Sequence, residues 1–234
     1  MIRALFTAAT GMQAQQLNLD TIANNLANVN TTGFKGQRAE FQDLVYETYR
    51  ASGANTGGSS STPQAAQIGL GSRFAASASN FAIGTMESSG DPFHLAINGD
   101  GFFQVTLPDG GTAYTRDGSF ALDSAGQLVT SDGYLIQPNI VVPTGATAVS
   151  IDQTGSVTSL LAGQTEPTLL GQLQLAVFPN AAGLTRVGQN LFRSGGGSGD
   201  ASIVTPGQEG SGTINQGFLE GSNVQVVEEM VKMI

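Results

Sequence analysis

Residues 2–26 read IRALFTAATGMQAQQLNLDTIANNL and contain the strongest pattern in the chain. Their apolar side chains recur in alternating steps of three and four, interrupted only at Gln16. This spacing places them on one stripe of a helix, as in a coiled-coil seam. The seam consists of Ile2, Leu5, Ala9, Met12, Leu19, Ala23 and Leu26. The other face is polar, with Gln13, Gln15, Asn18, Asn24 and Asn25. We therefore expect a two-sided helix that ends near Asn28.

A shorter stripe with the same spacing lies at the other end of the sequence. Its members are Val224, Val227, Val231 and Ile234. Ser222 and Gln225 have the spacing of a capping box, and Glu228 and Glu229 suit the first turn of a helix. No Gly, Asn or Pro follows to end the helix. We interpret residues 213–234 as the start of a C-terminal helix that is cut short.

The two stripes differ in length. At about 1.5 Å per residue, Ile2 to Leu26 spans about 37 Å, whereas Val224 to Ile234 spans about 16 Å. More than half of the N-terminal seam therefore has no partner from the C-terminal stripe. We expect neighbouring molecules to cover it. The alternative is that the seam packs on the middle of its own chain.

The composition excludes several classes of function. The 234 residues include 32 glycines and no cysteine, and the net charge is −9. Without cysteine there is no disulfide, thiol catalysis or thiolate-bound metal. The basic residues are scattered, which argues against nucleic-acid binding. No apolar run approaches the 20 or so residues of a membrane span, so we expect no membrane insertion. The apolar run at the N-terminus is also too short for an ordinary cleaved signal.

The order of patterns predicts an α+β fold, with paired N- and C-terminal coiled-coil-like helices and an inserted antiparallel, mainly β domain. The predicted regions are an N-terminal helical axial region (1–50), an extended Ser/Gly linker or arm (51–67), the β domain (68–212) and the C-terminal helix start (213–234). Within the first region, residues 28–33 are turn formers, and Gly33 suits a left-handed conformation. Residues 34–50 carry apolar side chains at roughly helical spacing, namely Phe41, Leu44, Val45 and Tyr49.

The β domain is predicted from short alternating runs that are separated by turn sequences. Phe93, Leu95 and Ile97 precede a turn at residues 98–101, and a second alternating run precedes Asp109-Gly110-Gly111. Further turns are expected at Asp117-Gly118 and at residues 131–133. Such Asp-Gly punctuation is typical of β-hairpins.

Candidate catalytic and metal-binding residues are few. His94 is the only histidine, and it lies in a predicted strand between two apolar residues. We interpret it as a half-exposed strand residue. The Asp-Gly clusters lack the ligand spacing of a calcium loop, and the glycine-rich segments lack the lysine of a phosphate loop. We therefore predict no catalytic, metal-binding or cofactor-binding residues, no cofactor and no enzymatic activity.

Three segments resemble the axial proteins of the bacterial flagellar rod and hook. The first is residues 22–35, Ile-Ala-Asn-Asn-Leu-Ala-Asn-Val-Asn-Thr-Thr-Gly-Phe-Lys. The second comprises Gly101-Phe102-Phe103-Gln104-Val105 and the run from Tyr114 to Phe120, and the third is residues 217–224. The signature residues of the first segment are Asn24, Asn25, Asn28, Thr32, Gly33, Phe34 and Lys35.

The resemblance implies a structural subunit. Residues 37–46 and the Ser/Gly/Gln-rich segment before Ile68 are similar to the distal rod members of the family. Such subunits are exported by the flagellar type III apparatus and polymerise helically into a hollow drive shaft. This shaft transmits torque across the periplasm to the hook. The expected location is the basal body, and the expected partners are copies of the chain itself, proximal rod and hook subunits, surrounding ring proteins and the export apparatus.

Two alternatives remain open at this stage. One is a proximal rod or hook subunit of the same family. The other, of a different class, is a secreted oligomeric glycine-rich adhesin-like binding protein whose helical ends form a closed trimer.

Overall fold

The computed structural model describes residues 2–53, 63–164, 166–208 and 210–234. The chain divides into two compact units. Unit 1 comprises Met1–Leu26, Gln37–Ser79 and Val227–Ile234, and unit 2 comprises Ala27–Gly36 and Asn80–Val226. Helices, strands and a β-rich unit together make the fold α+β, as the sequence predicts. No helix in the described ranges is long and apolar enough to cross a membrane.

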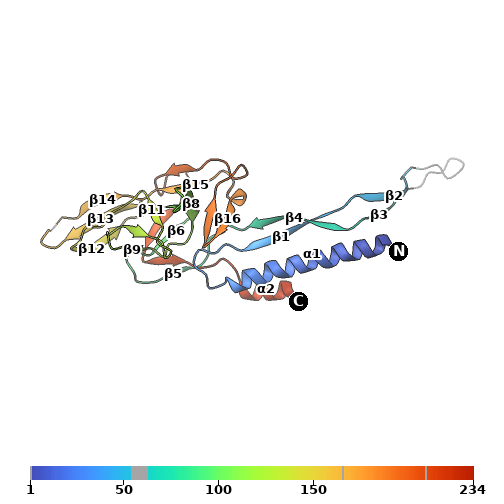
Figure 1. Ribbon diagram of the computed structural model, residues 1–234, viewed down its shortest axis with the longest axis horizontal. Coiled ribbons are helices and arrows are strands. Elements are labelled where there is room, and N and C mark those ends of the chain that lie inside the picture. The colour runs from blue at the N-terminus through green and yellow to red at the C-terminus, as the bar shows by residue number, and fades with distance from the viewer. Residues whose placement is uncertain (1, 54–62, 165, 209) are drawn as a thin grey trace. The chain divides into compact units, whose positions relative to one another are not determined.

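Unit 1 is built from a long helix, a β-ribbon and a short helix (Figure 1). The helix α1 spans Ile2–Ala27, and its end confirms the boundary predicted near Asn28. The ribbon pairs β1 (Gln37–Asp43) with β4 (Ser72–Ser79), and β2 (Tyr46–Arg50) with β3 (Ala66–Gly69), all antiparallel. The helix α2 spans Val226–Met233.

The helical interpretation of residues 34–50 is wrong, because this segment contains β1 and β2. Phe41 contacts Phe74 of β4, with ring centroids 6.0 Å apart. A cross-strand aromatic pair stabilises a sheet in this way, and the strand partner is about thirty residues away in the chain. Local spacing alone could not reveal that partner. Strands β3 and β4 also belong to unit 1, although the sequence analysis placed residues from Ile68 onward in the β domain.

Two further expectations concern the segments before α2 and between residues 51 and 67. Residues 213–216 and 218–220 form strands, and α2 begins only at Val226. The predicted capping box is therefore not formed, and the Ser222 hydroxyl instead accepts a hydrogen bond from the Val224 amide at 3.2 Å. The predicted arm at residues 51–67 includes residues 54–62, which lie outside the described residues, and its last two residues begin β3.

Unit 2 contains a seven-stranded antiparallel sheet and several smaller sheets. The large sheet has the strand order β16 (Thr185–Gly188), β17 (Leu191–Arg193), β8 (Thr112–Thr115), β7 (Phe103–Thr106), β11 (Leu135–Gln137), β10 (Leu128–Val129) and β9 (Ala121–Leu122). A three-stranded sheet joins β12 (Ala146–Ile151), β13 (Ser156–Leu161) and β14 (Thr168–Gln172). Three strand pairs complete the described strands: β15 (Leu175–Val177) with β18 (Ser202–Val204), β19 (Thr213–Gln216) with β6 (Leu95–Asn98), and β20 (Phe218–Glu220) with β5 (Met86–Ser88). A short 3₁₀ helix, η1, spans Ala181–Gly183.

The predicted hairpin turns are partly confirmed. Asp109-Gly110-Gly111 connects β7 with β8, and residues 131–133 connect β10 with β11. The turn at residues 98–101 does not make a hairpin, because β6 pairs with β19 near the end of the chain. A turn sequence indicates that the chain reverses, but it does not identify the strand partner.

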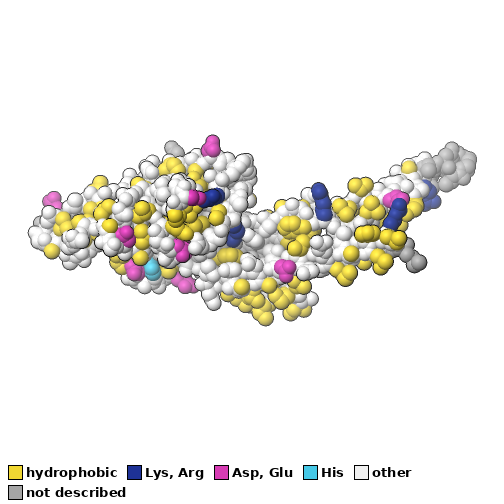
Figure 2. Space-filling view, in the orientation of Figure 1, with side chains coloured by type: hydrophobic (Ala, Val, Ile, Leu, Met, Phe, Trp, Pro, Cys, Tyr) yellow, Lys and Arg dark blue, Asp and Glu magenta, His cyan; other side chains and the backbone are white. Residues whose placement is uncertain are grey.

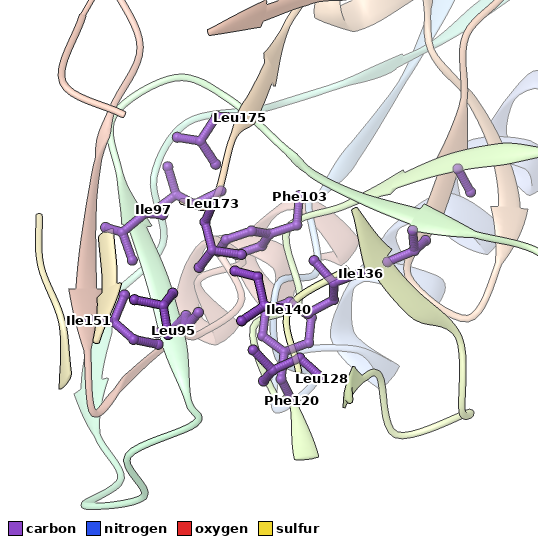
Figure 3. Close-up of a cluster of buried hydrophobic side chains, with 14 of the residues drawn as sticks. Leu95, Ile97, Phe103, Phe120, Leu128, Ile136, Ile140, Ile151, Leu173 and Leu175 are labelled. Carbon is purple, nitrogen blue, oxygen red and sulfur yellow. The ribbon is translucent and has the colours of Figure 1, made fainter. Parts of the chain in front are cut away.

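The core of unit 2 consists of buried aliphatic and aromatic side chains from several sheets (Figure 3). Phe103 of β7 and Phe120 lie edge to face at its centre, with centroids 5.0 Å apart. A second cluster is mainly aromatic and contains Phe102, Tyr114, Phe178 and Phe192. Burial of these side chains is the main source of stability for unit 2, and it provides a rigid base for the loop at residues 27–36.

Candidate functional site

The helix α1 turns a face of mainly small and polar side chains, together with Leu17 and Ile22, toward its own chain. Thr10, Ala14, Asn18, Thr21 and Asn25 recur in steps of three and four and are at least half-buried, as are the neighbouring Gly11, Leu17, Ile22 and Leu26. Gly71 of the ribbon approaches so closely that a Cβ there would lie 2.4 Å from the Thr10 hydroxyl oxygen. Nearer the N-terminus, Arg3 forms an ion pair with Glu47 of β2.

The apolar seam of α1 is largely exposed. Met12 retains 69% of its accessible surface and Leu19 retains 43%. Ile2, Leu5, Ala9 and Ala23 are also exposed, whereas Leu26 is half-buried. The seam is therefore not covered by the described part of its own chain.

The other parts of unit 1 also present apolar side chains. On α2, Val227 is 76% exposed and Val231 is exposed, as is Ile234 directly after the helix. Val224, which precedes the helix and belongs to unit 2, is half-buried. The ribbon adds the exposed residues Val45, Tyr49 and Ile68. Figure 2 displays hydrophobic side chains gathered over α1 and α2. Soluble monomers rarely expose contiguous apolar patches of large area, so this surface is a candidate interface.

The helices α1 and α2 are connected by a polar contact. The Asn25 side-chain amide donates to the Gln37 carbonyl oxygen at 2.8 Å and to the Glu229 carboxylate at 3.0 Å. Its oxygen accepts from the Gln37 amide at 2.9 Å. Asn25 and Glu229 are both buried. This signature asparagine therefore fixes the start of β1 and the orientation of α2, while the apolar stripes of both helices stay exposed.

The signature loop at residues 27–36 lies on the core of unit 2. Asn28 begins a turn in which its side-chain oxygen accepts from the Thr31 hydroxyl, at 3.2 Å. The Thr32 carbonyl accepts from the Asn190 side chain at 3.0 Å. The side chain of Asn24, in the preceding helix, is exposed. Gly33 has φ +67°, which confirms the predicted left-handed conformation, and its amide donates to the Glu220 carbonyl at 2.7 Å.

Substitution of Gly33 by alanine is expected to lower the free energy of unfolding by about 2–4 kcal/mol. A Cβ at this position would lie 2.8 Å from the Arg116 carbonyl carbon and 2.7 Å from the Asp117 nitrogen, and neither backbone atom can give way cheaply. Gly133 is the matched control, since it also has positive φ but has no atom within 4 Å of its Cβ position. Gly133→Ala should cost about 1 kcal/mol. Urea unfolding of both variants checks this difference, and equal losses would contradict it.

Phe34 and Lys35 are the buried anchors of the signature loop. The Arg186 guanidinium lies over the Phe34 ring at 5.2 Å and over Phe192 at 5.3 Å, and it also donates to the Lys35 carbonyl oxygen. Guanidinium groups attract aromatic faces in this geometry. These contacts hold the signature loop against the aromatic cluster of unit 2.

The Lys35 ammonium enters a fully buried ion cluster with Glu220 and Arg116. Lys35 Nζ lies 2.5 Å from Glu220 Oε1, and Arg116 Nη1 lies 3.4 Å from Glu220 Oε2. Burial lowers the pKa of Lys35, although the Glu220 carboxylate opposes this shift. Burial also lowers the pKa of Arg116. One carboxylate from near the C-terminus thus neutralises cations from the signature loop and from the middle of the chain.

Sequence reasoning missed the partners of this cluster. Glu220 lies in the quoted segment 217–224 and Arg116 in the segment 114–120, so both fall in runs that resemble the family. The pattern alone did not reveal that the segments meet in space. A buried charge is stable only beside an opposite charge. The presence of one ionisable residue in each of the three motifs was therefore the signal that could have predicted this cluster.

The remaining chemistry is sparse. His94 is half-buried, forms an isolated bridge with Ser119 and contacts the Ser89 hydroxyl through Nδ1 at 2.8 Å. Among the described residues, no group of three or more His, Asp or Glu side chains could hold a metal ion. An open groove of about 460 Å³ lies beside the signature loop and is lined by Val29, Thr32, Ile83, Thr85 and Leu219, among others.

Three family models match separate parts of the chain. A flagella basal body rod protein model covers residues 5–35. A model of the flagellar hook protein FlgE/F/G D1 domain covers residues 96–159. A model of the flagellar basal body rod FlgEFG protein C-terminal covers residues 215–234. The matched regions include most of α1, the signature loop as far as Lys35, and Glu220.

Full-length similarity points to one member of this group. The flagellar basal-body rod protein FlgG of Borreliella burgdorferi is 49% identical over 236 residues, which cover 100% of this chain and 89% of that protein. The FlgG proteins of Caulobacter vibrioides and Bacillus subtilis are 44% and 42% identical, with the same coverage of both chains. The flagellar hook protein FlgE of Helicobacter mustelae is 40% identical over only 58% of this chain and 30% of its own length. The chain belongs to the FlgG family of flagellar basal-body rod proteins and is a structural subunit of the rod.

Proposed function

We propose that this rod subunit polymerises helically through the exposed apolar surface of unit 1. The observation that carries the proposal is the orientation of α1, whose mainly polar face, with the buried Ile22, contacts its own chain while its seam is largely exposed. Burial of apolar surface drives most protein association. A helix with an uncovered seam therefore gains most of its stabilisation from neighbouring copies. The resulting hollow shaft is the distal rod, which transmits torque across the periplasm to the hook.

The contacts between copies join unlike surfaces. In our proposal, the seam of α1 forms coiled-coil-like contacts with Val227 and Val231 of α2 and the adjacent Ile234 in the assembled rod. It also contacts ribbon residues such as Tyr49 and Ile68. A contact between two different patches is heterologous, and repeated heterologous contacts form rings or open helices. A long shaft requires contacts that form an open helix. The arm at residues 51–67 reaches adjacent copies and stiffens the shaft, and the β domain forms its outer layer.

The further partners follow from this role. The shaft contacts proximal rod subunits at one end and hook subunits at the other, and it turns inside surrounding ring proteins. The chain reaches its site through the flagellar export apparatus. We assign no cofactor, metal or enzymatic activity to it. A hook role is less well supported, because the similarity to the hook protein covers 58% of the chain whereas FlgG similarity covers all of it.

Light scattering of the purified chain over a range of concentrations tests the proposal. Open helical growth predicts a mass that keeps rising with concentration above a threshold, with filaments visible by electron microscopy. A mass that levels off at a trimer would favour the adhesin-like alternative. A mass that stays at the monomer over the whole range would contradict assembly through the seam.

A further inference from the structure

Three chain segments of unit 2 meet near three of the four places where the chain passes from one unit to the other. They are residues 33–36, residues 80–85 and residues 220–223. The first precedes β1, the second follows β4, and the third precedes α2. Their backbones are hydrogen-bonded to one another, for example Asn80 N–H to the Gly36 carbonyl at 2.8 Å and Gly221 N–H to the Thr85 carbonyl at 2.7 Å.

The side chain of Asn223 joins all three segments. Its Oδ1 accepts from the Gly36 amide at 2.8 Å. Its Nδ2 donates to the carbonyl oxygens of Asn80 at 2.8 Å and Ala82 at 3.1 Å. The amide therefore uses one acceptor and both donors, and the three partners fix which atom is oxygen and which is nitrogen. Among side chains of this size, only asparagine supplies this combination.

The buried ion cluster reinforces the same meeting point. Lys35 Nζ donates to the Ala82 carbonyl at 2.8 Å, so this carbonyl accepts from both Lys35 and Asn223. Glu220 Oε1, which pairs with Lys35, also accepts from the Gly84 amide at 3.0 Å. Each of the three segments thus contributes to one continuous hydrogen-bonded network.

We propose that Asn223 is a positioning residue that clamps the three connecting segments together. The inference deepens the proposed function, because a subunit that transmits torque must pass load along these connections. A load on any one segment is then shared by the other two through the Asn223 amide. Without it, each connection would move separately while the core of unit 2 stayed folded.

Hydrogen exchange, measured by NMR on the unassembled chain, tests the clamp. Asn223→Ala removes all three side-chain bonds, so the Gly36 amide loses its acceptor and its exchange should rise about tenfold. The Ala82 amide donates to Asn80 Oδ1 at 3.0 Å, so its exchange reports opening of residues 80–82 once Asn223 no longer holds their carbonyls, and it should rise by a similar factor. Asn223→Asp keeps the acceptor for Gly36 but loses both donors. It should raise exchange about tenfold at Ala82 and leave Gly36 nearly unchanged. The amides of Val105 and Ala113 in the core strands should be unaffected in both variants.

The control is Asn30→Ala, because Asn30 is an exposed asparagine near the same loop. This variant should leave the exchange rates of all these amides unchanged. Exchange that rises equally in the core strands, in either variant, would mean general destabilisation and would overturn the clamp. Unchanged exchange at both Gly36 and Ala82 in Asn223→Ala would overturn it as well. Since no assembly is required, failure of the chain to polymerise counts against the proposed function and not against this inference.

Discussion

Replacement of Glu220 by glutamine should lower the free energy of unfolding of unit 2 by about 3–5 kcal/mol. Glutamine keeps the size of the side chain but leaves Lys35 buried without a counter-charge, and leaves Arg116 with only the attraction of the Asp100 carboxylate. Both cations are at most 1% exposed, so water cannot replace the lost carboxylate. Breaking a buried pair in this way is costly even where the intact pair adds little net stability.

The loss of unfolding free energy in Glu220→Gln should become smaller as the pH rises above neutral. Without the carboxylate, only burial and the positive charge of Arg116 act on Lys35, and both lower its pKa, so this pKa falls further below the ordinary value of 10.5. The native state then releases this proton at a lower pH than the unfolded state does. The free energy of unfolding of the variant therefore rises as the pH increases through the native pKa toward 10.5. The deficit relative to the unsubstituted chain should be largest near neutral pH and smaller in alkaline solution.

Chemical denaturation of unit 2 at several pH values measures both effects. Glu87→Gln is the matched control, since Glu87 is an exposed carboxylate on β5, the strand that pairs with β20. Its effect should stay within about 0.5 kcal/mol. A deficit below about 1 kcal/mol for Glu220→Gln would mean that the cluster does not hold the signature loop.

The sequence predicted those features that depend on local pattern. The three-four spacing and the turn formers located α1 and its end, and the glycine chemistry located the turn at Gly33. Asp109-Gly110-Gly111 predicted a hairpin because a short turn both reverses the chain and places its neighbours side by side. The α+β class followed from these local signals.

Features that depend on distant partners could not be predicted in the same way. Residues 37–50 look helical because Phe41, Leu44, Val45 and Tyr49 have helical spacing, but pairing with β3 and β4 overrides this preference. The side chains that α1 turns toward its own chain could not be predicted for a related reason. The usual rule places the apolar face inward, and it assumes that the chain covers its own apolar surface. A subunit that assembles can reverse this arrangement, as the contact of Thr10 with Gly71 and the exposure of Met12 indicate.

Substitution of Met12 by aspartate should raise the threshold concentration for assembly by at least about a hundredfold. Met12 is exposed in the single chain, so the variant should fold with nearly unchanged stability. In the proposed rod this position becomes buried, and a carboxylate there would lose its hydration without gaining a partner. That cost arises only on assembly, which separates an interface residue from a core residue.

Gln13→Asp provides the matched comparison, since it introduces the same charge one residue later on the same helix. Gln13 is exposed and lies about 100° around the helix from Met12, off the seam. Sedimentation of polymer at increasing concentration gives the threshold for assembly. Thermal unfolding of the unassembled chains gives the stability of the single subunit. If the two variants assemble equally well, the seam does not contribute the contact. If Met12→Asp unfolds the single chain, the residue supports the fold of its own subunit, and the driving force for the rod must lie on another surface of unit 1. Retained stability combined with lost assembly is the outcome that only an uncovered seam explains.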